Sequence, residues 1–235
     1  MAIQGHRLFI VLLMLFFSSL AFADTRAEQA AKRVKPVLVS ALEETNLTYG
    51  NAVFIRIFKA EKDLELWVKR GERFVLFKTY PICTFSGRLG PKIRQGDNQA
   101  PEGFYSVGLG QLNPNSRYHL SFNLGYPNAY DRANQRTGDF LMVHGNCVSI
   151  GCYAMGDAAI EEIYTLMEAA LRNGQSTIDV HVFPFRYDST KILWQQSEWQ
   201  AFWSDLKPGF DAFNASKKPP AIRVVSKRYK ITATP

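Results

Sequence analysis

The 235-residue chain has little cysteine and histidine, with three Cys and four His in all. Structural zinc sites take about four Cys or His ligands, arranged as closely spaced pairs. His144, Cys147 and Cys152 form one such group, but no second closely spaced pair accompanies it. The sequence therefore disfavours a structural zinc site, and we expect neither a metal nor another cofactor.

A membrane-spanning helix needs about 20 apolar residues, and no apolar run of that length follows residue 23. The one apolar run, LFIVLLMLFFSSL, follows a short basic start and leads to the small-x-small ending AFA. This order is typical of a secretory signal peptide. We expect residues 1–23 to be cleaved off after Ala23 and the protein to be periplasmic, with no stable membrane span. An uncleaved N-terminal anchor is the alternative.

Dense basic clusters are also lacking, although the formal net charge is +7. The basic residues are scattered, with modest groups only at 32–35 and 227–230. Nucleic-acid-binding proteins gather such residues on one face, so we expect no nucleic-acid partner. A hydrophobic content of 46% with 21% charged residues is that of an ordinary globular protein.

Residues 24–50 contain the pattern of an amphipathic helix. Val34, Leu38 and Leu42 recur at helical spacing, and Pro36 is expected to kink or restart the helix. From residue 51 the apolar period changes to two. The segments VFIRIF, LELWVK and RFVLFKTYPICTF predict three strands, whose short connections favour an antiparallel meander.

Residues 86–103 are rich in Gly, Pro and Asn and predict a long surface loop. Its basic side chains fit contact with the carboxylates of a peptide substrate and exposure to solvent equally well. These side chains are Arg88, Lys92 and Arg94.

Strand patterns continue in GFYSVGLGQL, RYHLSFNLGY and FLMVHG. Residues 156–174 then predict a helix, because apolar side chains recur on one face and Asn-Gly closes the segment. TIDVHVFPF predicts a strand, and residues 188–206 predict a helix. One more strand is expected after Pro219-Pro220.

The predicted fold is a mostly β body with flanking helices, of the α+β class. We expect one catalytic domain over residues 51–187 and, packed on it, a C-terminal extension over 188–235 with a helix and a strand. The three tryptophans of that helix are interpreted as packing against the sheet, in preference to stacking on a sugar or a membrane. They are Trp194, Trp199 and Trp203.

The stretch MVHGNCVSIGCYAM brings a histidine close to two cysteines. In an oxidising compartment thiols tend to pair, but three is an odd number, so at least one stays free within a chain. A Cys147–Cys152 bridge closes only a small ring and gains little. A Cys83–Cys147 bridge is more useful and spares Cys152, and Cys147 packing as a small apolar residue is the simplest alternative.

A thiol nucleophile with its base explains more of this stretch. An imidazole near Cys152 raises the thiolate fraction and can later protonate a leaving amine. Gly151 allows the backbone to approach a substrate carbonyl, so that the Cys152 amide and its neighbour can donate to an oxyanion, each worth about 3 kcal/mol. His119 and His181, on predicted strands, are interpreted as structural.

His144-Gly145 followed by Ser149-x-Gly151-Cys152 resembles the catalytic signature of the L,D-transpeptidase (YkuD-like) family. QAPEGFYSV resembles the family's TPxGxY element, and SFNLGYPNAYD resembles its next strand and loop. The C-terminal FWSDLKPGFDAF…PPAIRVV resembles the extended, exported Gram-negative branch. The resemblance implies the family's β-sandwich or barrel catalytic domain.

By this resemblance Cys152 is the acyl-forming nucleophile and His144 its general base. The Gly145 carbonyl orients the imidazole, and Ser149 and Gly151 shape the oxyanion region. The implied substrate is a peptidoglycan stem tetrapeptide, attacked at the amide after the L-centre of diaminopimelate. D-Ala leaves, and the acyl group passes to an amine without a metal.

The sequence also departs from the family pattern. Ile150 stands where most members have His, Ala154 where many have Arg or Asn, and only seven residues separate His144 from Cys152. The acceptor is therefore open between a stem peptide, the amine of a peptidoglycan-attached protein, and water. With water the same chemistry makes an amidase, and a non-catalytic wall-binding module is the third alternative.

Overall fold

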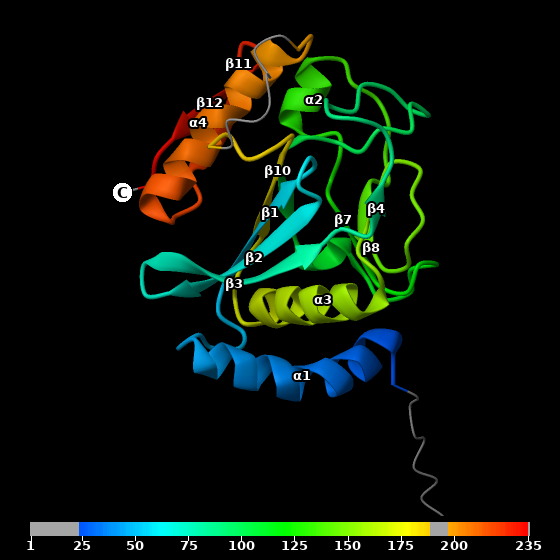
Figure 1. Cartoon of the computed structure of the whole chain (residues 1–235), viewed down its shortest axis with the longest axis vertical. Helices are drawn as coiled ribbons and strands as arrows, with labels where there is room; N and C mark the ends of the chain where they lie inside the picture. The colour runs from blue at the N-terminus through cyan, green and yellow to red at the C-terminus, as the bar shows by residue number, and fades with distance from the viewer. Residues whose placement is uncertain (1–23, 189–196, 235) are drawn as a thin grey trace, which may run out of the picture.

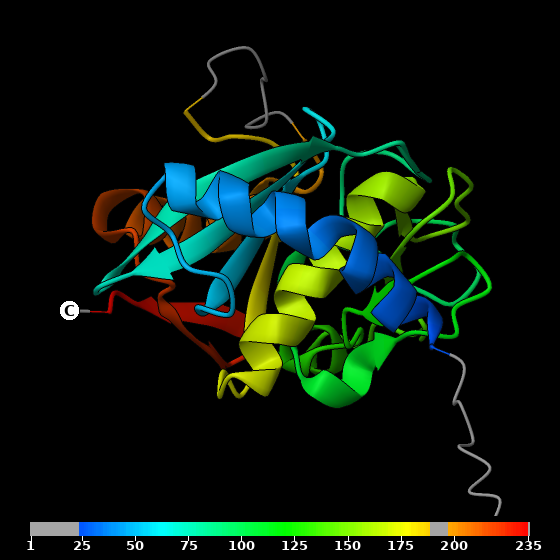
Figure 2. The same cartoon turned by 90° about the horizontal axis from the view of Figure 1, so that it is seen from below.

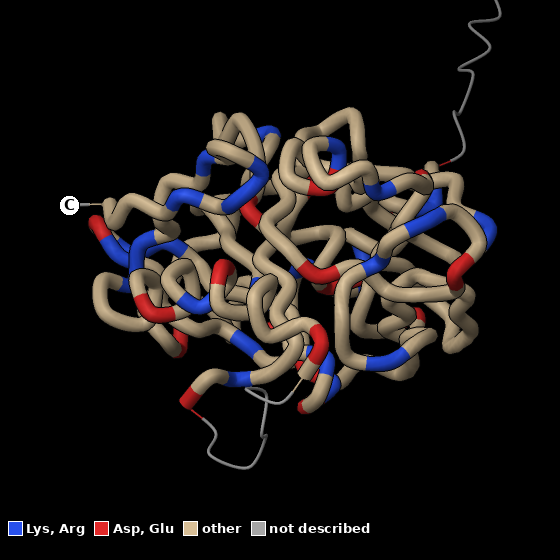
Figure 3. Tube along the Cα trace, turned by 90° about the horizontal axis from the view of Figure 1, so that it is seen from above, with Lys and Arg blue, Asp and Glu red and all other residues tan. Residues whose placement is uncertain are grey.

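The computed structural model of the chain describes residues 24–188 and 197–234. The predicted signal segment lies outside these residues. Within them, no helix combines the length and the apolar character needed to cross a membrane. Lys and Arg are dispersed among Asp and Glu over the chain trace (Figure 3).

One sheet, which we call sheet A, has five strands in the order β3-β2-β1-β10-β5. The predicted antiparallel meander forms its first half, because β1 pairs with β2 and β2 with β3. β10 then pairs parallel with β1 and antiparallel with β5. The strands are β1 (Val53–Phe58), β2 (Asp63–Arg70), β3 (Arg73–Pro81), β10 (Ile178–Phe183) and β5 (Gly103–Val107).

The second sheet, sheet B, is built from very short strands in the order β4-β9-β8-β7-β6. β8 and β9 pair parallel, whereas the other neighbours are antiparallel. The strands are β4 (Thr84–Phe85), β9 (Tyr153–Ala154), β8 (Met142–His144), β7 (Ser121–Asn123) and β6 (Leu112–Asn113). A 3-10 turn (Leu109–Gln111) precedes β6.

The N-terminal helix α1 (Arg26–Glu44) is continuous through Pro36. Pro36 lies on the exposed face, where water can bond the carbonyl that the proline leaves unpaired, so the helix neither stops nor restarts there. Thr25 and Glu28 close a capping box at its start. α1 packs across α3 (Asp157–Arg172), which lies between α1 and the sheets (Figures 1 and 2).

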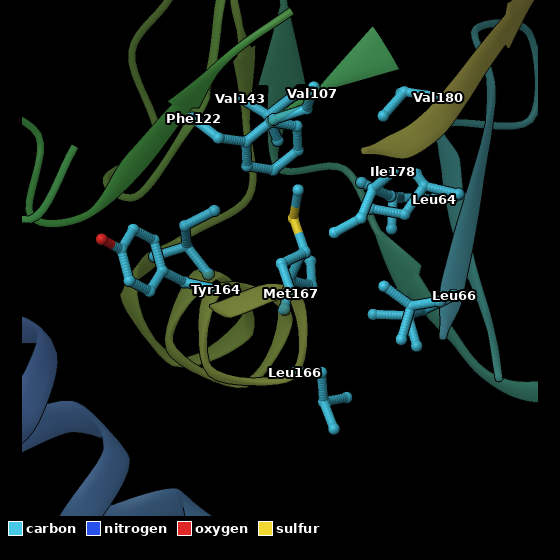
Figure 4. Close-up of a cluster of buried hydrophobic side chains, with 14 of the residues drawn as sticks. Leu64, Leu66, Val107, Phe122, Val143, Tyr164, Leu166, Met167, Ile178 and Val180 are labelled. Atoms are coloured by element: carbon cyan, nitrogen blue, oxygen red, sulfur yellow. The ribbon is translucent and has the colours of Figure 1, made fainter. Parts of the chain in front are cut away.

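The main core lies between the two sheets and α3. Figure 4 shows Met167 of α3 pointing toward Phe122 and Val143 of sheet B, with Leu64 and Ile178 of sheet A beside it. These side chains are fully buried. At about 25 cal/mol per Å² of apolar surface, this burial is the main force that holds the sheets in place.

The C-terminal extension covers the other face of sheet A with α4 (Gln200–Ser216) and a hairpin of β11 (Ala221–Val225) and β12 (Arg228–Thr232). A second, aromatic core forms there, in which Phe183 and Phe104 of the sheet contact Phe210 and Tyr229 of the extension. Trp203 is buried in this core, as predicted, and Trp199 is half-buried against it. Trp194 lies outside the described residues.

Two boundaries in this region differ from the sequence predictions. The described helix begins at Gln200 and runs to Ser216, whereas we expected helix over 188–206, and residues 189–196 of that range are not described. Pro208 and Gly209 lie inside α4, where the missing Cβ of Gly209 leaves room for the Phe104 ring. The predicted last strand is a two-stranded hairpin.

Candidate active site

A cavity of about 410 Å³ lies at the end of sheet B where the HG and GC motifs meet. It is lined by both residues of the predicted catalytic pair and by Gly151. Its other walls include Lys92, Tyr118 and Ile150.

The parallel pairing of β8 with β9 brings the two motifs together. His144, the last residue of β8, is in register with Ala154, and Cys152 immediately precedes β9. The Met142 amide at the start of β8 lies 3.4 Å from the Cys152 Sγ and donates to it. The seven residues between His144 and Cys152 are enough for this arrangement, because β9 is the direct neighbour of β8 and the chain only has to return to the start of β8.

His144 is buried and fixed in one orientation. Its Nδ1 lies 2.5 Å from the Gly145 carbonyl oxygen, and the Tyr118 ring stacks on the imidazole at 4.8 Å between centroids. A carbonyl can only accept, so Nδ1 carries the proton and Nε2 keeps the lone pair of a base. Burial lowers the pKa of His144, while the bond to Gly145 raises it, with a net decrease. The imidazole is therefore neutral at pH 7.

Gly145 occupies a position that has no room for a side chain. A Cβ there would lie 2.6 Å from the Asp157 Oδ1, 2.8 Å from the Tyr118 carbonyl and 2.9 Å from the His119 Cβ. The same Asp157 Oδ1 accepts a 2.7 Å hydrogen bond from the Asn146 amide. The start of α3 thus clamps the backbone that orients the imidazole.

The thiol of Cys152 is half-buried, and burial raises its pKa above the ordinary value. The Met142 amide and the charge of Lys92 act in the opposite direction but do not offset burial. The pair at rest is thus a neutral thiol beside a neutral imidazole. Such a pair acts when the base removes the thiol proton during attack.

Lys92 is buried, whereas the sequence left open whether this side chain contacts a substrate or is exposed to solvent. It is only 4% exposed, and its Nζ donates to the Asp97 Oδ1 at 2.6 Å and to the Arg94 carbonyl at 3.0 Å. Lys92 and Asp97 are five residues apart in an irregular loop, where no apolar periodicity indicates which side chains are buried. Arg88 and Arg94 line a separate surface hollow instead.

Ser149 and Gly151 form the turn that presents Cys152. The Ser149 hydroxyl donates to the Cys152 carbonyl at 2.7 Å and accepts from the Gly151 amide at 3.2 Å. Gly151 has φ +138°, which side-chain-bearing residues rarely adopt. The Gly151 amide is therefore engaged within the turn by the Ser149 hydroxyl.

The disulfide joins Cys83 to Cys147, with 5.5 Å between their Cα atoms. This is the pairing that spares Cys152, so Cys147 is neither an isolated apolar residue nor a partner of Cys152. Cys152 is the free cysteine of the chain. The bridge also anchors the spacer between the two motifs to the segment between β3 and β4.

His119 and His181, interpreted as structural, do not line the catalytic cavity. His119 Nε2 lies 2.7 Å from the Glu161 Oε1, although His119 is in a turn with φ +69° and not on a strand. His181 in β10 is buried between the rings of Phe54 and Phe104. Over residues 24–188 and 197–234, no three His, Cys, Asp or Glu side chains gather closely enough to hold a metal ion.

The fold and this site define a class of protein. The L,D-transpeptidase catalytic domain (YkuD) family matches residues 52–200, and the chain belongs to that family. This confirms the family inferred from the motifs.

Curated relatives of the chain carry the name of the same family. The chain is 44% identical over 228 residues to the protein named "Putative L,D-transpeptidase YafK" of Escherichia coli strain K12. That alignment covers 97% of this chain and 91% of the relative. The protein of the same name from Escherichia coli O157:H7 is equally similar.

Among solved structures, the helical cell shape determining protein Pgp2 of Campylobacter jejuni is 18% identical, with a TM-score of 0.47. That match covers 75% of this chain and 73% of Pgp2. Bd1075 of Bdellovibrio bacteriovorus is 20% identical with a TM-score of 0.40, covering 70% and 58% of the two chains.

Proposed function

We propose that the protein is an exported cysteine acyltransferase that acts on peptidoglycan stem peptides through Cys152 and His144. The observation that carries this proposal is the pairing of Cys83 with Cys147, which leaves one free thiol, in the same cavity as a buried histidine. Membership of the L,D-transpeptidase family supports the substrate class.

In the proposed acylation, His144 Nε2 removes the Cys152 proton as Sγ attacks the amide carbonyl after the L-centre of diaminopimelate. The Cys152 amide stabilises the oxyanion. The tetrahedral intermediate collapses to a thioester as the imidazolium returns its proton to the departing D-Ala amine. An acceptor amine then gives up a proton to His144, attacks the thioester and forms a new amide, restoring the thiol.

Hydrolysis is the second candidate, with water in place of the acceptor amine. Ile150, at the position where most family members have His, lines the cavity and is 82% exposed. An isoleucine offers an incoming amine no hydrogen bond, so an acceptor must be held by other groups or replaced by water. The product would then be a cleaved link between peptidoglycan and a peptide or protein.

Acylation by a carbapenem separates both enzymatic functions from a non-catalytic wall-binding module. We expect the folded protein to gain the mass of one carbapenem, located on Cys152 by peptide mapping. Cys152→Ala should gain none. The double variant Cys83→Ser/Cys147→Ser, in which Cys152 is the sole thiol, should still be acylated. Failure of the folded wild-type protein to react would contradict the proposal.

A further inference from the structure

A second cavity, of about 650 Å³, lies apart from Cys152 and shares no lining residue with the catalytic cavity. Its walls are β5, the segment that leads into α2 (Ala129–Ala133), part of β10, and β11 of the C-terminal hairpin. Its volume is within the range of about 300–1,000 Å³ usual for ligand sites. We call it the hairpin groove. The proposed acyl transfer gives it no role.

One wall of the groove is the free edge of sheet A. Among the strands of residues 24–188 and 197–234, β5 pairs with β10 alone, and no strand lies along its other edge. The Phe104 amide donates to the Tyr229 hydroxyl, and the Phe104 carbonyl accepts from Asn128 Nδ2, so both groups point away from β10. Backbone groups alternate in direction along an antiparallel strand. The amide and carbonyl of Ser106, two residues on, therefore also face the groove.

The opposite wall is another strand edge. Within the described part of the chain, β11 pairs with β12 alone, through a two-residue turn at Ser226-Lys227. With Val225 and Arg228 as the closing pair, the backbone groups of Val224 and Ile222 point to the free edge. Val225 is 49% exposed although it is apolar. Strand edges of this kind are templates for an added strand.

Polar side chains add a chemical preference to this backbone template. Asp179 and Ser106 are cross-strand partners on the floor of the groove. Burial raises the pKa of Asp179, with the hydrogen bond from Ser106 acting in the opposite direction, and the net increase reduces its repulsion of an anionic ligand. His181, 1% exposed, also lines it, and its Nδ1 has no hydrogen-bond partner in the part of the chain that the structure describes. Arg132 and Arg223, both exposed, contribute two cationic groups at the rim.

We infer that the hairpin groove binds a short, extended, acidic peptide as a strand added to the edge of β5. The backbone of Ser106 supplies the strand hydrogen bonds, and Arg132 and Arg223 meet the peptide carboxylates. Apolar side chains of the peptide pack on Ile222 and Val224 of the hairpin. This site does not depend on the chemistry of Cys152.

The test uses the chain from Asp24 onward, with Cys152→Ala so that no peptide can be processed. The probes are acetyl-Glu-Val-Glu-Val and, as its charge-reversed match, acetyl-Lys-Val-Lys-Val amide. Binding is followed by ¹⁵N chemical-shift changes. We expect saturable shifts at the amides of Ser106, Ile222 and Val224, and an affinity at least about tenfold higher for the acidic peptide.

Charge variants make the test specific. Arg132→Glu/Arg223→Glu should lower the affinity for the acidic peptide by at least about tenfold. Arg132→Gln/Arg223→Gln should lower it by less, because the positive charges are removed but not reversed. Arg73→Glu reverses an exposed charge on β3, far along sheet A from β5, and should change nothing. The amide spectrum of each variant reports whether it is folded.

Four results would overturn the inference. One is no saturable binding at about 1 mM peptide, and the second is binding that the arginine variants leave unchanged. The third is shifts at β11 that depend on protein concentration without peptide, which would make the hairpin edge a contact between copies of this chain. Shifts confined to Gly151 and Ile150 would place the peptide in the catalytic cavity and would count equally against the groove.

Discussion

At the scale of single residues, the site combines a neutral thiol with a neutral imidazole. Burial raises the pKa of Cys152 and lowers that of His144, so neither group is charged at rest. A resting ion pair would require shifts in the opposite directions. The motifs indicated which two side chains would share the site, but they could not predict this protonation state, because burial is set by residues distant in the chain such as Tyr118 and Lys92.

This protonation state predicts the pH dependence of alkylation. Only the thiolate reacts with iodoacetamide, and a raised pKa means less thiolate at a given pH. The rate constant for Cys152 in folded protein should therefore rise with a midpoint above that of the same thiol in urea, about 8.5. Rates measured from pH 6 to about 10 by quantitative mass spectrometry check this. A folded-state midpoint below the urea value would show a resting ion pair instead.

A second residue-scale prediction concerns Gly145. Gly145→Ala adds a Cβ within 3 Å of three atoms, so the backbone that orients His144 must shift. A displacement of about 1 Å in a catalytic group can lower a rate about 100-fold, and we expect that loss in the rate of carbapenem acylation.

Gly110→Ala is the matched control, since a Cβ there meets nothing within 4 Å. It should acylate at the wild-type rate. Wild-type acylation by a folded Gly145→Ala variant would show that the Gly145 backbone does not position the base.

At the scale of elements, sequence periodicity predicted the parts that have a long repeat. β1, β2, β3 and β10 are rich in β-branched and aromatic residues, and the helix at 157–172 has an apolar face and a closing Asn-Gly. Strands of two or three residues, such as β8 and β9, are too short for a repeat to identify. The C-terminal hairpin also escaped prediction, because its turn residues Ser226 and Lys227 have positive φ without the usual Asn-Gly sequence.

The turn that carries Cys152 yields an element-scale prediction. Ser149→Ala removes both hydrogen bonds that close this turn, to the Cys152 carbonyl and from the Gly151 amide. The proposed nucleophile and base remain, but the Cys152 amide loses its fixed direction. We expect carbapenem acylation to slow about 10- to 100-fold, with little change in thermal stability.

Ser86→Ala is the control for this prediction. It removes only the 3.4 Å contact between the Ser86 and Ser149 hydroxyls, and the acylation rate should stay near that of wild type. Equal acylation rates for Ser149→Ala and Ser86→Ala would show that the hydrogen bonds of Ser149 do not affect acylation.

At the scale of the whole molecule, the site depends on parts that are far apart in the chain. Lys59 and Glu102 form a buried ion pair, and Lys59 also donates to the Gly90 and Ala100 carbonyls. Glu102 accepts from the Trp203 indole of α4. The sheet, the loop that holds Lys92 and the C-terminal extension are thus tied together at one buried point. Sequence analysis predicted that the extension packs on the domain but not this connection, since the two charges are 43 residues apart.

The Cys83–Cys147 disulfide leads to a prediction about the stability of the whole molecule. It joins residues 64 positions apart, and a cross-link of that span is expected to stabilise the fold by about 4 kcal/mol through the unfolded state. Cys83→Ser/Cys147→Ser should lower the free energy of unfolding in urea by up to this amount, without abolishing acylation of Cys152. A loss below about 1 kcal/mol would contradict the role assigned to the bridge.

The measurement that tests the central claim most directly is the muropeptide profile of isolated sacculi after incubation with the protein. Acyl transfer by Cys152 predicts loss of D-Ala from stem tetrapeptides, together with new 3–3 crosslinks or attached amines identified by mass spectrometry. Cys152→Ala should leave the profile unchanged, and Cys83→Ser/Cys147→Ser should reproduce the wild-type products. Release of attached peptide or protein without a new amide would contradict transfer and establish hydrolysis. An unchanged profile with wild-type protein would contradict both.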